Sequence, residues 1–398
     1  MVEAGAFEFA ETEQFLKAGE GLVGDYVWGR YDILLLPPSF PYGGMENPCL
    51  TFVTPTLLAG DRSLANVVAH EIAHSWTGNL VTNKTWEHFW LNEGFTVFLE
   101  RKILGRMHGE RHFQFGAQAG YAALEGAVKS YGATHNFTRL VPDLSGGADP
   151  DDAFSRIPYE KGFYFLYYLQ TVVGAGPFEA FLAKYIKEFQ YQTVTSNAFK
   201  DYFMAHFAGH DGITAVDWDT WLYSPGMPPV ENVYDTSMAE AAHKLALKWH
   251  TSDVFGRGGG GAQREATDIV PFSSEQVVEF LNKLGQLRAL TPLAHDSLAK
   301  MDGIYQLSKS GNSEIRHAWY MLCIPAKYPP VLPEVGRFLK EQGRMKFLRP
   351  LYKALIRTGD FGDKFARDTF AEARGGYHPI AVKVVEGDLK AGGAPRAD

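Results

Sequence analysis

The chain of 398 residues is long enough for two or three domains of ordinary size. Hydrophobic residues make up 45% and charged residues 21%, which is the usage of a globular protein and excludes a disordered or fibrous chain. The formal net charge is -8, so we expect no basic face and no nucleic-acid partner.

Signals for membrane insertion and export are missing from the sequence. No stretch approaches the roughly 18 apolar residues that a membrane helix needs, and the first residues include no apolar signal-peptide core. The two cysteines, Cys49 and Cys323, lie far apart and are interpreted as free thiols. We therefore expect a cytoplasmic protein without a membrane span.

Short strands are the first elements expected along the chain. β-Branched, aromatic and leucine residues between Pro and Gly breaks predict strands at about 31–36 and 50–53. A helical spacing of apolar residues then predicts helices at 64–76 and 91–104. Helices dominate from there to about residue 207, including an amphipathic helix at 163–171.

The segment Ser224-Pro225-Gly226-Met227-Pro228-Pro229 is the clearest break in the chain and predicts a domain boundary. We expect one domain at 1–228 and an α-helical C-terminal domain at 229–398. The later helical runs show no clean repeat, but they favour an α-solenoid of the HEAT or armadillo type. These runs lie at 239–249, 274–287, 333–342 and 348–357. A flexible loop is predicted at 256–261, and the predicted fold class is mostly α with a small β-sheet.

Two histidines four residues apart predict a metal site. His70 and His74 fall on one face of a predicted helix, so both imidazoles can reach one ion. Glu93, on the next predicted helix, adds a carboxylate with eighteen residues between it and His74. Two histidines and one carboxylate form a zinc ligand set that leaves a position for water, and Glu71 stands beside it as a general base.

The competing interpretation is a pair of core histidines beside an ion-paired glutamate. The second glutamate at this separation disfavours that interpretation. Glu100, seven residues after Glu93, is predicted either to orient a ligand histidine or to be a solvated helix residue.

A second cluster lies upstream in Tyr42-Gly43-Gly44-Met45-Glu46. Paired glycines let a ligand approach an extended backbone closely, and Glu46 adds a carboxylate beside that path. Alone, the segment is equally typical of a turn. Together with the zinc helix, it predicts a peptide laid along a strand edge with its free amine held by Glu46.

These motifs resemble a known enzyme family. Gly43-Gly44-Met45-Glu46-Asn47, His70-Glu71-x-x-His74 and Glu93 are similar to the gluzincin zinc aminopeptidases, whose strand motif is GxMEN. The segments 36–48 and 75–79 resemble the leukotriene A4 hydrolase/aminopeptidase branch, and the resemblance covers essentially the whole chain. It implies a thermolysin-like zinc metallopeptidase domain followed by an α-helical domain. It also implies two reactions at one site: removal of N-terminal residues from short peptides and hydrolysis of the lipid epoxide leukotriene A4.

The resemblance implies roles for single residues as well. It makes His70, His74 and Glu93 the zinc ligands and Glu71 the general base. The implied substrate-binding residues are Tyr42, Gly43, Gly44, Met45, Glu46, Asp151, Arg344 and Lys346. Tyr159 is the implied hydrogen-bond donor to the developing oxyanion, where charge appears only in the transition state.

Asp151 is the residue that the resemblance links to water delivery in the lipid reaction. Arg344 and Lys346 are the implied partners of a substrate carboxylate, which an arginine fork pairs well. Without the resemblance, these two cations would be interpreted as helix-end residues.

The chain departs from the family pattern at two points. Phe154 stands where the branch carries a tyrosine, which removes a hydroxyl near the lipid path. The family's N-terminal β-sheet domain is also missing, so we expect a truncated form.

Three alternatives to the aminopeptidase stay open. An endopeptidase would use the same zinc ion but needs no carboxylate for a free amine. A non-catalytic binding or scaffold protein would hold a structural zinc ion closed by a fourth protein ligand. The lipid reaction needs a long cavity in addition to zinc.

Overall fold

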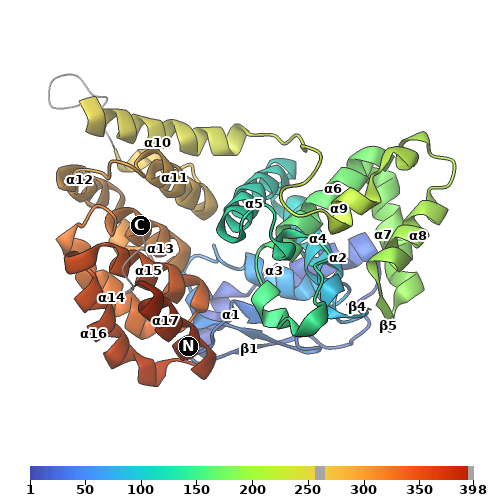
Figure 1. Cartoon of the computed structure of the whole chain (residues 1–398), viewed down its shortest axis with the longest axis horizontal. Coiled ribbons are helices and arrows are strands. Elements are labelled where there is room, and N and C mark those ends of the chain that lie inside the picture. Colours follow the sequence, from blue (N-terminus) through green and yellow to red (C-terminus); the bar gives the residue numbers. More distant parts are fainter. Residues whose placement is uncertain (256–264, 393–398) are drawn as a thin grey trace.

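The computed structural model describes residues 1–255 and 265–392, which form two parts packed side by side (Figure 1). The flexible loop predicted at 256–261 lies outside the described residues. Within those two ranges, no helix is both long and apolar enough to cross a membrane. Cys49 and Cys323 are free thiols, as predicted.

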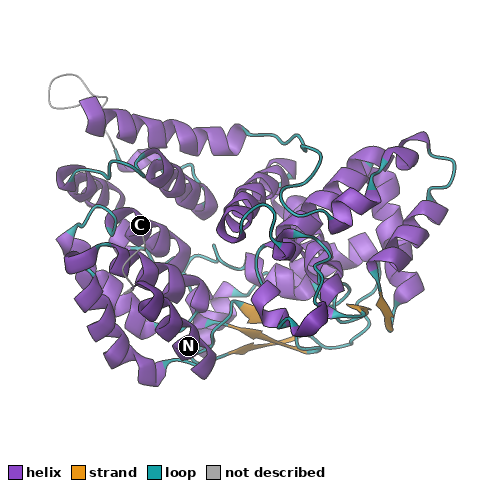
Figure 2. Ribbon diagram, viewed as in Figure 1, coloured by secondary structure: helices purple, strands orange, loops and turns teal. Residues whose placement is uncertain are grey.

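The first part of the chain is mostly helical (Figure 2). Its helices are α1 (Val2–Glu8), α2 (Thr12–Val23), α3 (Asn66–Ala73), α4 (Trp90–His108), α5 (Glu110–Tyr131), α6 (Gly162–Val173), α7 (Ala175–Phe189), α8 (Ser196–His206) and α9 (Trp218–Tyr223). The sequence analysis predicted no helix where α1 and α2 lie. α2 packs against α3, α4 and α7, and so belongs to the core of this part.

Two small sheets accompany these helices. In the first, β1 (Asp32–Leu35) runs parallel to β3 (Leu50–Val53), and β2 (Gly44–Met45) pairs antiparallel with β3. The strands predicted at about 31–36 and 50–53 are thereby confirmed. β4 (Val81–Asn83) and β5 (Gln192–Val194) form a parallel pair. Because the order is β1–β3–β2, strand β2 lies at a sheet edge.

Helix α4 lies at the centre of the first core. Its residues from Trp90 to Leu99 are buried without interruption because α3, α5 and α6 pack around it. Most of α6 is buried as well, and only the face with Tyr168, Thr171 and Val172 reaches solvent, so the predicted helix at 163–171 is present with a narrow exposed face. Phe165 of α6 contacts Trp218 and Trp221 of α9, which cover the face that solvent would otherwise wet.

Helix α3 is shorter than the predicted helix at 64–76 and ends at Ala73. The chain turns after His74, and Gly78 adopts a φ of 136°, which a side chain would strain. A Cβ at Gly78 would also meet His74 Nδ1 at 2.8 Å. This turn returns the Thr77 carbonyl oxygen to the imidazole of His74.

The second part of the chain is entirely helical within the described residues. Its helices are α10 (Ser237–Phe255), α11 (Ser274–Leu287), α12 (His295–Tyr305), α13 (Ser313–Cys323), α14 (Leu332–Glu341), α15 (Met345–Arg357), α16 (Asp363–Ala373) and α17 (Pro379–Gly392). These helices surround a core of their own, and most of the contacts join every second helix, as between α11 and α13, α13 and α15, and α15 and α17. The mostly helical fold class with a small sheet is thereby confirmed. The boundary predicted at 228/229 falls between the end of the first core at Leu222 and the start of the second at Ala242.

Backbone hydrogen bonds join the helical domain to the strand region. The Gly343 N–H donates to the Pro38 carbonyl oxygen at 2.7 Å, and the Met345 N–H donates to the Pro41 carbonyl oxygen at 2.9 Å. The loop between α14 and α15 is therefore fixed beside the segment that leads into strand β2.

Candidate active site

Three candidate metal ligands converge where α3 meets α4. His70 lies on α3, His74 follows its last residue, and Glu93 lies in the first turn of α4. The Nε2 atoms of His70 and His74 lie 3.5 and 3.3 Å from Glu93 Oε2. The structure thus brings together the three residues that the sequence predicts as ligands.

The geometry of this cluster fits a tetrahedral metal ion. Two ligands bound about 2.1 Å from such an ion lie about 3.4 Å apart, close to both observed separations. Glu93 Oε2 is buried and has no hydrogen-bond partner among the described residues. A buried carboxylate oxygen without a partner is costly, and a cation would remove that cost. Two imidazoles and one carboxylate also leave a position for a substrate or water.

The outer ring nitrogens of both histidines are held by acceptors. His70 Nδ1 donates to Glu100 Oε2 at 2.9 Å, and His74 Nδ1 donates to the Thr77 carbonyl oxygen at 2.9 Å. Because neither acceptor carries a proton, each Nδ1 keeps its hydrogen and each Nε2 offers its lone pair to a metal. Thr96 Oγ1 lies 3.0 Å from the same nitrogen of His74. Of the two interpretations of Glu100, the contact supports the orienting one.

Glu71 lies between the histidines and the edge strand. Burial raises the pKa of its carboxyl group to about 7, although the charges of His70 and His74 oppose that rise. A Cβ added to Gly44 would collide with this carboxylate, so the strand approaches it only because residue 44 is glycine. Glu71 therefore faces both the ligand cluster and any peptide laid along β2.

Glu46 brings a second carboxylate to the same place. The ligand atoms of Glu46, Glu71 and His74 all lie within 4.8 Å of one another. Glu46 Oε1 is 3.9 Å from His74 Nδ1, a nitrogen that already donates to Thr77 and cannot also bind a metal. Asn79 Nδ2 donates to the Glu46 carbonyl oxygen at 2.7 Å and holds the segment in position. This second cluster is anionic and suits an ammonium group.

Tyr159 stacks on the ring of His70. The two ring centroids are 6.1 Å apart, with an angle of 20° between the planes. Burial, followed by the charge of Glu93, raises the pKa of the phenol well above its usual value. Tyr159 is therefore a neutral hydrogen-bond donor beside the ligand cluster.

Arg344 and Lys346 enter from the helical domain at the start of α15. A Cβ added to Gly43 would collide with the Arg344 guanidinium, so this cation lies directly against the strand segment. Glu314 on α13 accepts a hydrogen bond from Lys346 Nζ at 2.5 Å and lies 3.7 Å from Arg344 Nη1. Arg344 Nε is buried and has no hydrogen-bond partner among the described residues. Two cations around one carboxylate leave a net positive charge that suits an anionic group.

Asp151 and Phe154 lie at the rim of the site. Asp151 is exposed in the turn Pro150–Ala153, and after burial its charge is the next cause of the raised pKa of Tyr42. It is not among the clustered ligand atoms. Phe154 contacts Tyr159 and Phe89, with ring centroids 6.1 and 5.9 Å apart.

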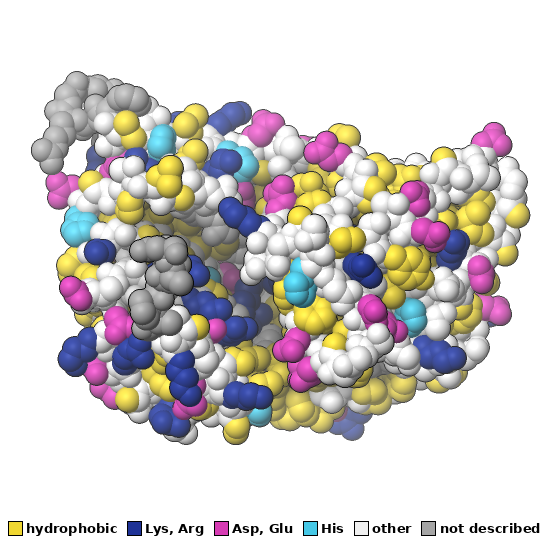
Figure 3. Space-filling model, in the orientation of Figure 1, with side chains coloured by type: hydrophobic (Ala, Val, Ile, Leu, Met, Phe, Trp, Pro, Cys, Tyr) yellow, Lys and Arg dark blue, Asp and Glu magenta, His cyan; other side chains and the backbone are white. Residues whose placement is uncertain are grey.

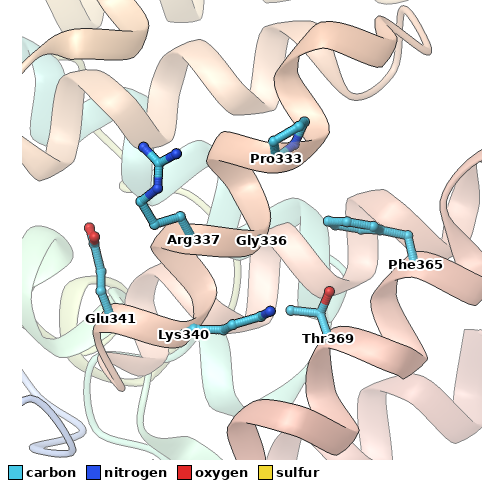
Figure 4. Close-up of a pocket in the computed structure, with 7 residues that line it drawn as sticks. All are labelled: Pro333, Gly336, Arg337, Lys340, Glu341, Phe365 and Thr369. Carbon is cyan, nitrogen blue, oxygen red and sulfur yellow. The ribbon is translucent and has the colours of Figure 1, made fainter.

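The surface is hollowed between the two parts of the molecule. Lys and Arg side chains gather in this hollow on the side of the helical domain (Figure 3). A separate shallow pocket of about 440 Å³ lies between α14 and α16, lined by residues between Pro333 and Glu341 and by Phe365 and Thr369 (Figure 4). No predicted site residue lines that pocket.

The sequence analysis missed two polar contributors. Thr96 follows Glu93 by three residues and precedes Glu100 by four, so a helical-face argument from Glu93 would have found it. Glu314 lies thirty residues before Arg344 on another helix, and no local pattern marks it.

Family models match both parts of the chain. Residues 7–221 match the peptidase family M1 domain, and residues 272–389 match the C-terminal domain of leukotriene A4 hydrolase. The first match corresponds closely to the first core, and the second covers the second core except for helix α10.

Individual relatives are similar over nearly the whole chain. Leukotriene A-4 hydrolase of Xenopus laevis is 48% identical over 98% of this chain and 63% of the relative. Leucine aminopeptidase 2 of Ajellomyces capsulatus is 42% identical over 96% of this chain and 60% of the relative. The structure of yeast leukotriene A4 hydrolase in complex with bestatin superimposes with a TM-score of 0.92 at 39% identity, over 98% of this chain and 64% of that one. The chain thus spans about three fifths of the length of these relatives.

Proposed function

The chain belongs to the M1 peptidase family, and from this premise we propose that it is a zinc aminopeptidase that removes N-terminal residues from short peptides. His70, His74 and Glu93 hold the zinc ion in this proposal. The family match and the similarity to leucine aminopeptidase 2 support it.

One observation carries the proposal: the metal-ligand cluster and the anionic cluster share His74. Glu46, directly after the edge strand β2, therefore has a carboxylate oxygen within 4.8 Å of a ring nitrogen of His74. A carboxylate there pairs with the α-ammonium group of a peptide and limits cleavage to the first peptide bond. An endopeptidase has no use for such a charge.

Each side chain then has a defined task. A bound zinc ion supplies a Lewis acid that polarises the peptide carbonyl and makes water a stronger acid. Glu71 accepts a proton from the attacking water and returns it to the leaving amine. Tyr159 donates a hydrogen bond to the oxygen on which negative charge develops. The backbone at Gly43 and Gly44 aligns the substrate along the edge of β2.

The cations of the helical domain define the length of the substrate. Arg344 and Lys346 bind the C-terminal carboxylate of a peptide whose amine is held by Glu46. Substrates are therefore peptides of a few residues with both ends free.

The test is cleavage of a tripeptide with a free amine beside its N-acetylated form, using the zinc-loaded chain. We expect cleavage of the free peptide only, loss of cleavage with a chelator, and recovery when zinc is returned. Glu46→Gln should lower kcat/KM for the free peptide by about 10- to 100-fold, the value of a charge-assisted contact of roughly 1.5–3 kcal/mol.

Two outcomes of this test would overturn the proposal in different ways. Equal cleavage of both peptides would favour the endopeptidase. No cleavage by a chain that binds one zinc ion per molecule would favour the binding or scaffold protein.

A second candidate activity is hydrolysis of a lipid epoxide such as leukotriene A4. The aromatic wall beside Tyr159 favours it: Phe154 contacts Phe89, and Phe89 contacts Trp86 with ring centroids 5.6 Å apart. Such a wall suits an unsaturated acyl chain, and Asp151 at the rim is the residue proposed to guide water. Incubation with leukotriene A4 and analysis of the diol product tests this activity, and peptide cleavage without conversion of the lipid would remove it.

A further inference from the structure

Tyr159 belongs to a π-helical turn, Ile157–Lys161, that leads directly into α6. Single π-helical turns are rare and are common at functional sites. Pro158 lies at the start of this turn, where a backbone N–H would have no helical partner in any case. The side chains that flank Tyr159 then connect the turn to the rest of the fold.

Glu160, the next residue, forms a buried ion pair with Arg101 of α4. Arg101 Nη2 donates to both carboxylate oxygens, at 2.9 and 3.0 Å. The two side chains are only 12% and 7% exposed, for Arg101 and Glu160 respectively. The Arg101 guanidinium also lies over the ring of Phe163, 4.2 Å from its centroid. A buried ion pair in which one guanidinium nitrogen donates to both carboxylate oxygens restricts the relative positions of Arg101 and Glu160.

Small residues make room for this ion pair. A Cβ added to Gly120 of α5 would collide with both the Glu160 carboxylate and Arg101. Near the other end of the turn, a Cβ on Gly94 would meet the Cα of Gly162 at 2.7 Å, so the two backbones touch beside Glu93. The π-helical turn is thus fastened to α4 at two points.

Lys161 fastens the turn on a third side. Its Nζ donates to the carbonyl oxygens of Thr138, Ser224 and Gly226, at 2.9, 3.0 and 2.9 Å. The last two carbonyls belong to the connector toward the helical domain. This contact anchors the π-helical turn in the fold, but none of the three carbonyl oxygens lies on α3 or α4, so it does not fix the turn relative to those helices.

We infer that the Arg101–Glu160 ion pair positions Tyr159, by holding the turn that carries it against the helix that carries Glu93 and Glu100. Neither member belongs to the cluster of ligand atoms, so both act through Tyr159 as positioning residues. The inference rests on the proposed function, which gives the phenol its task.

A double-mutant cycle in peptide cleavage tests the inference. Glu160→Gln removes the charge with almost no change in shape, and it is measured alone and together with Tyr159→Phe. Alone, it should lower kcat by about 10-fold, with KM and zinc content unchanged, because a small displacement of a catalytic group has effects of this size. In the Tyr159→Phe background it should add less than about 2-fold, since there is no hydroxyl left to misplace.

Glu179→Gln is the matched control. Glu179 pairs with Lys102, the neighbour of Arg101 on α4, at 3.1 Å, but its partner helix α7 does not carry Tyr159. This variant removes a more exposed carboxylate that pairs with Lys102 and Arg106 of the same helix, and it should leave kcat within about 2-fold in both backgrounds.

An equal loss from Glu160→Gln in both backgrounds would show a general structural role and overturn the inference, as would an unchanged kcat. If Glu160→Gln does not fold, Arg101→Lys goes through the same cycle, since it keeps the charge and loses the contact with two oxygens. A fully active Tyr159→Phe enzyme would instead remove the proposed role of Tyr159 itself, and the inference would fall for that separate reason.

Discussion

The two charged clusters of the site are built in opposite ways. The metal-ligand cluster comes from α3 and α4, which pack against each other inside one core. The cation cluster comes from α13 and α15 of the helical domain and meets the strand segment across the seam between the two parts. In the proposed function, the first part therefore supplies the chemistry and the seam selects the substrate.

The largest expected effect is on zinc content, which should depend on the metal-ligand cluster and not on the cation cluster. His74→Ala removes a metal ligand of the proposed site, so we expect loss of bound zinc and of all peptide cleavage. Arg344→Met should keep one zinc ion per chain. Metal content measured on both purified variants checks this. Zinc retained at full stoichiometry by His74→Ala would contradict the ligand assignment.

The next effect isolates the chemical step within the first cluster. Glu71→Gln should lower kcat by about 10²- to 10⁴-fold because a general acid–base group is lost. Zinc content should stay the same, and KM should change by no more than about 2-fold. Steady-state kinetics with a free tripeptide gives both constants. A large rise in KM with kcat unchanged would assign Glu71 to binding instead.

A smaller effect is expected from Arg344, at the seam between the two parts. Arg344→Met should lower kcat/KM by about 10- to 100-fold for a tripeptide with a free C-terminal carboxylate, the loss of one charge-assisted hydrogen bond. The C-terminal amide of the same tripeptide should be cut equally well by both enzymes.

Arg337→Met is the matched control for this prediction. Arg337 is an exposed cation of α14 in an ion pair with Glu334, and removing it should change neither substrate. If Arg344→Met lowered kcat/KM equally for the acid and the amide, the cation cluster would not select substrates by their C-terminal carboxylate.

The smallest effect acts behind the metal ligands. Thr96→Val removes a hydroxyl 3.0 Å from His74 Nδ1, and it should weaken zinc affinity by about 10-fold. The preference for acid over amide peptides should not change. Competition with a chelator measures the affinity, and an unaltered value would mean that the Thr77 carbonyl oxygen alone orients His74.

Much of the candidate metal site could be predicted from local sequence pattern. His70, Glu71 and His74 share one helix, so their mutual geometry follows from a spacing of four residues. Four helices of the second part, α10, α11, α14 and α15, were also predicted, most closely α11, because their apolar residues recur with a helical period. The extent to which α6 is buried depends on α9, some fifty residues away, and the end of α3 depends on the turn at Gly78.

The sequence by itself predicts the His70–Glu71–His74 pattern and the mostly helical class, because these depend on local spacing and apolar periodicity. The approach of Glu93 to the two histidines also needed the packing of α3 against α4. Tertiary structure alone decided that Arg344 lies against Gly43, that Glu314 holds Lys346, and that Arg101 reaches Glu160. Each of these contacts joins residues from different helices or domains. Their geometry depends on how the elements pack, and no local period records that packing.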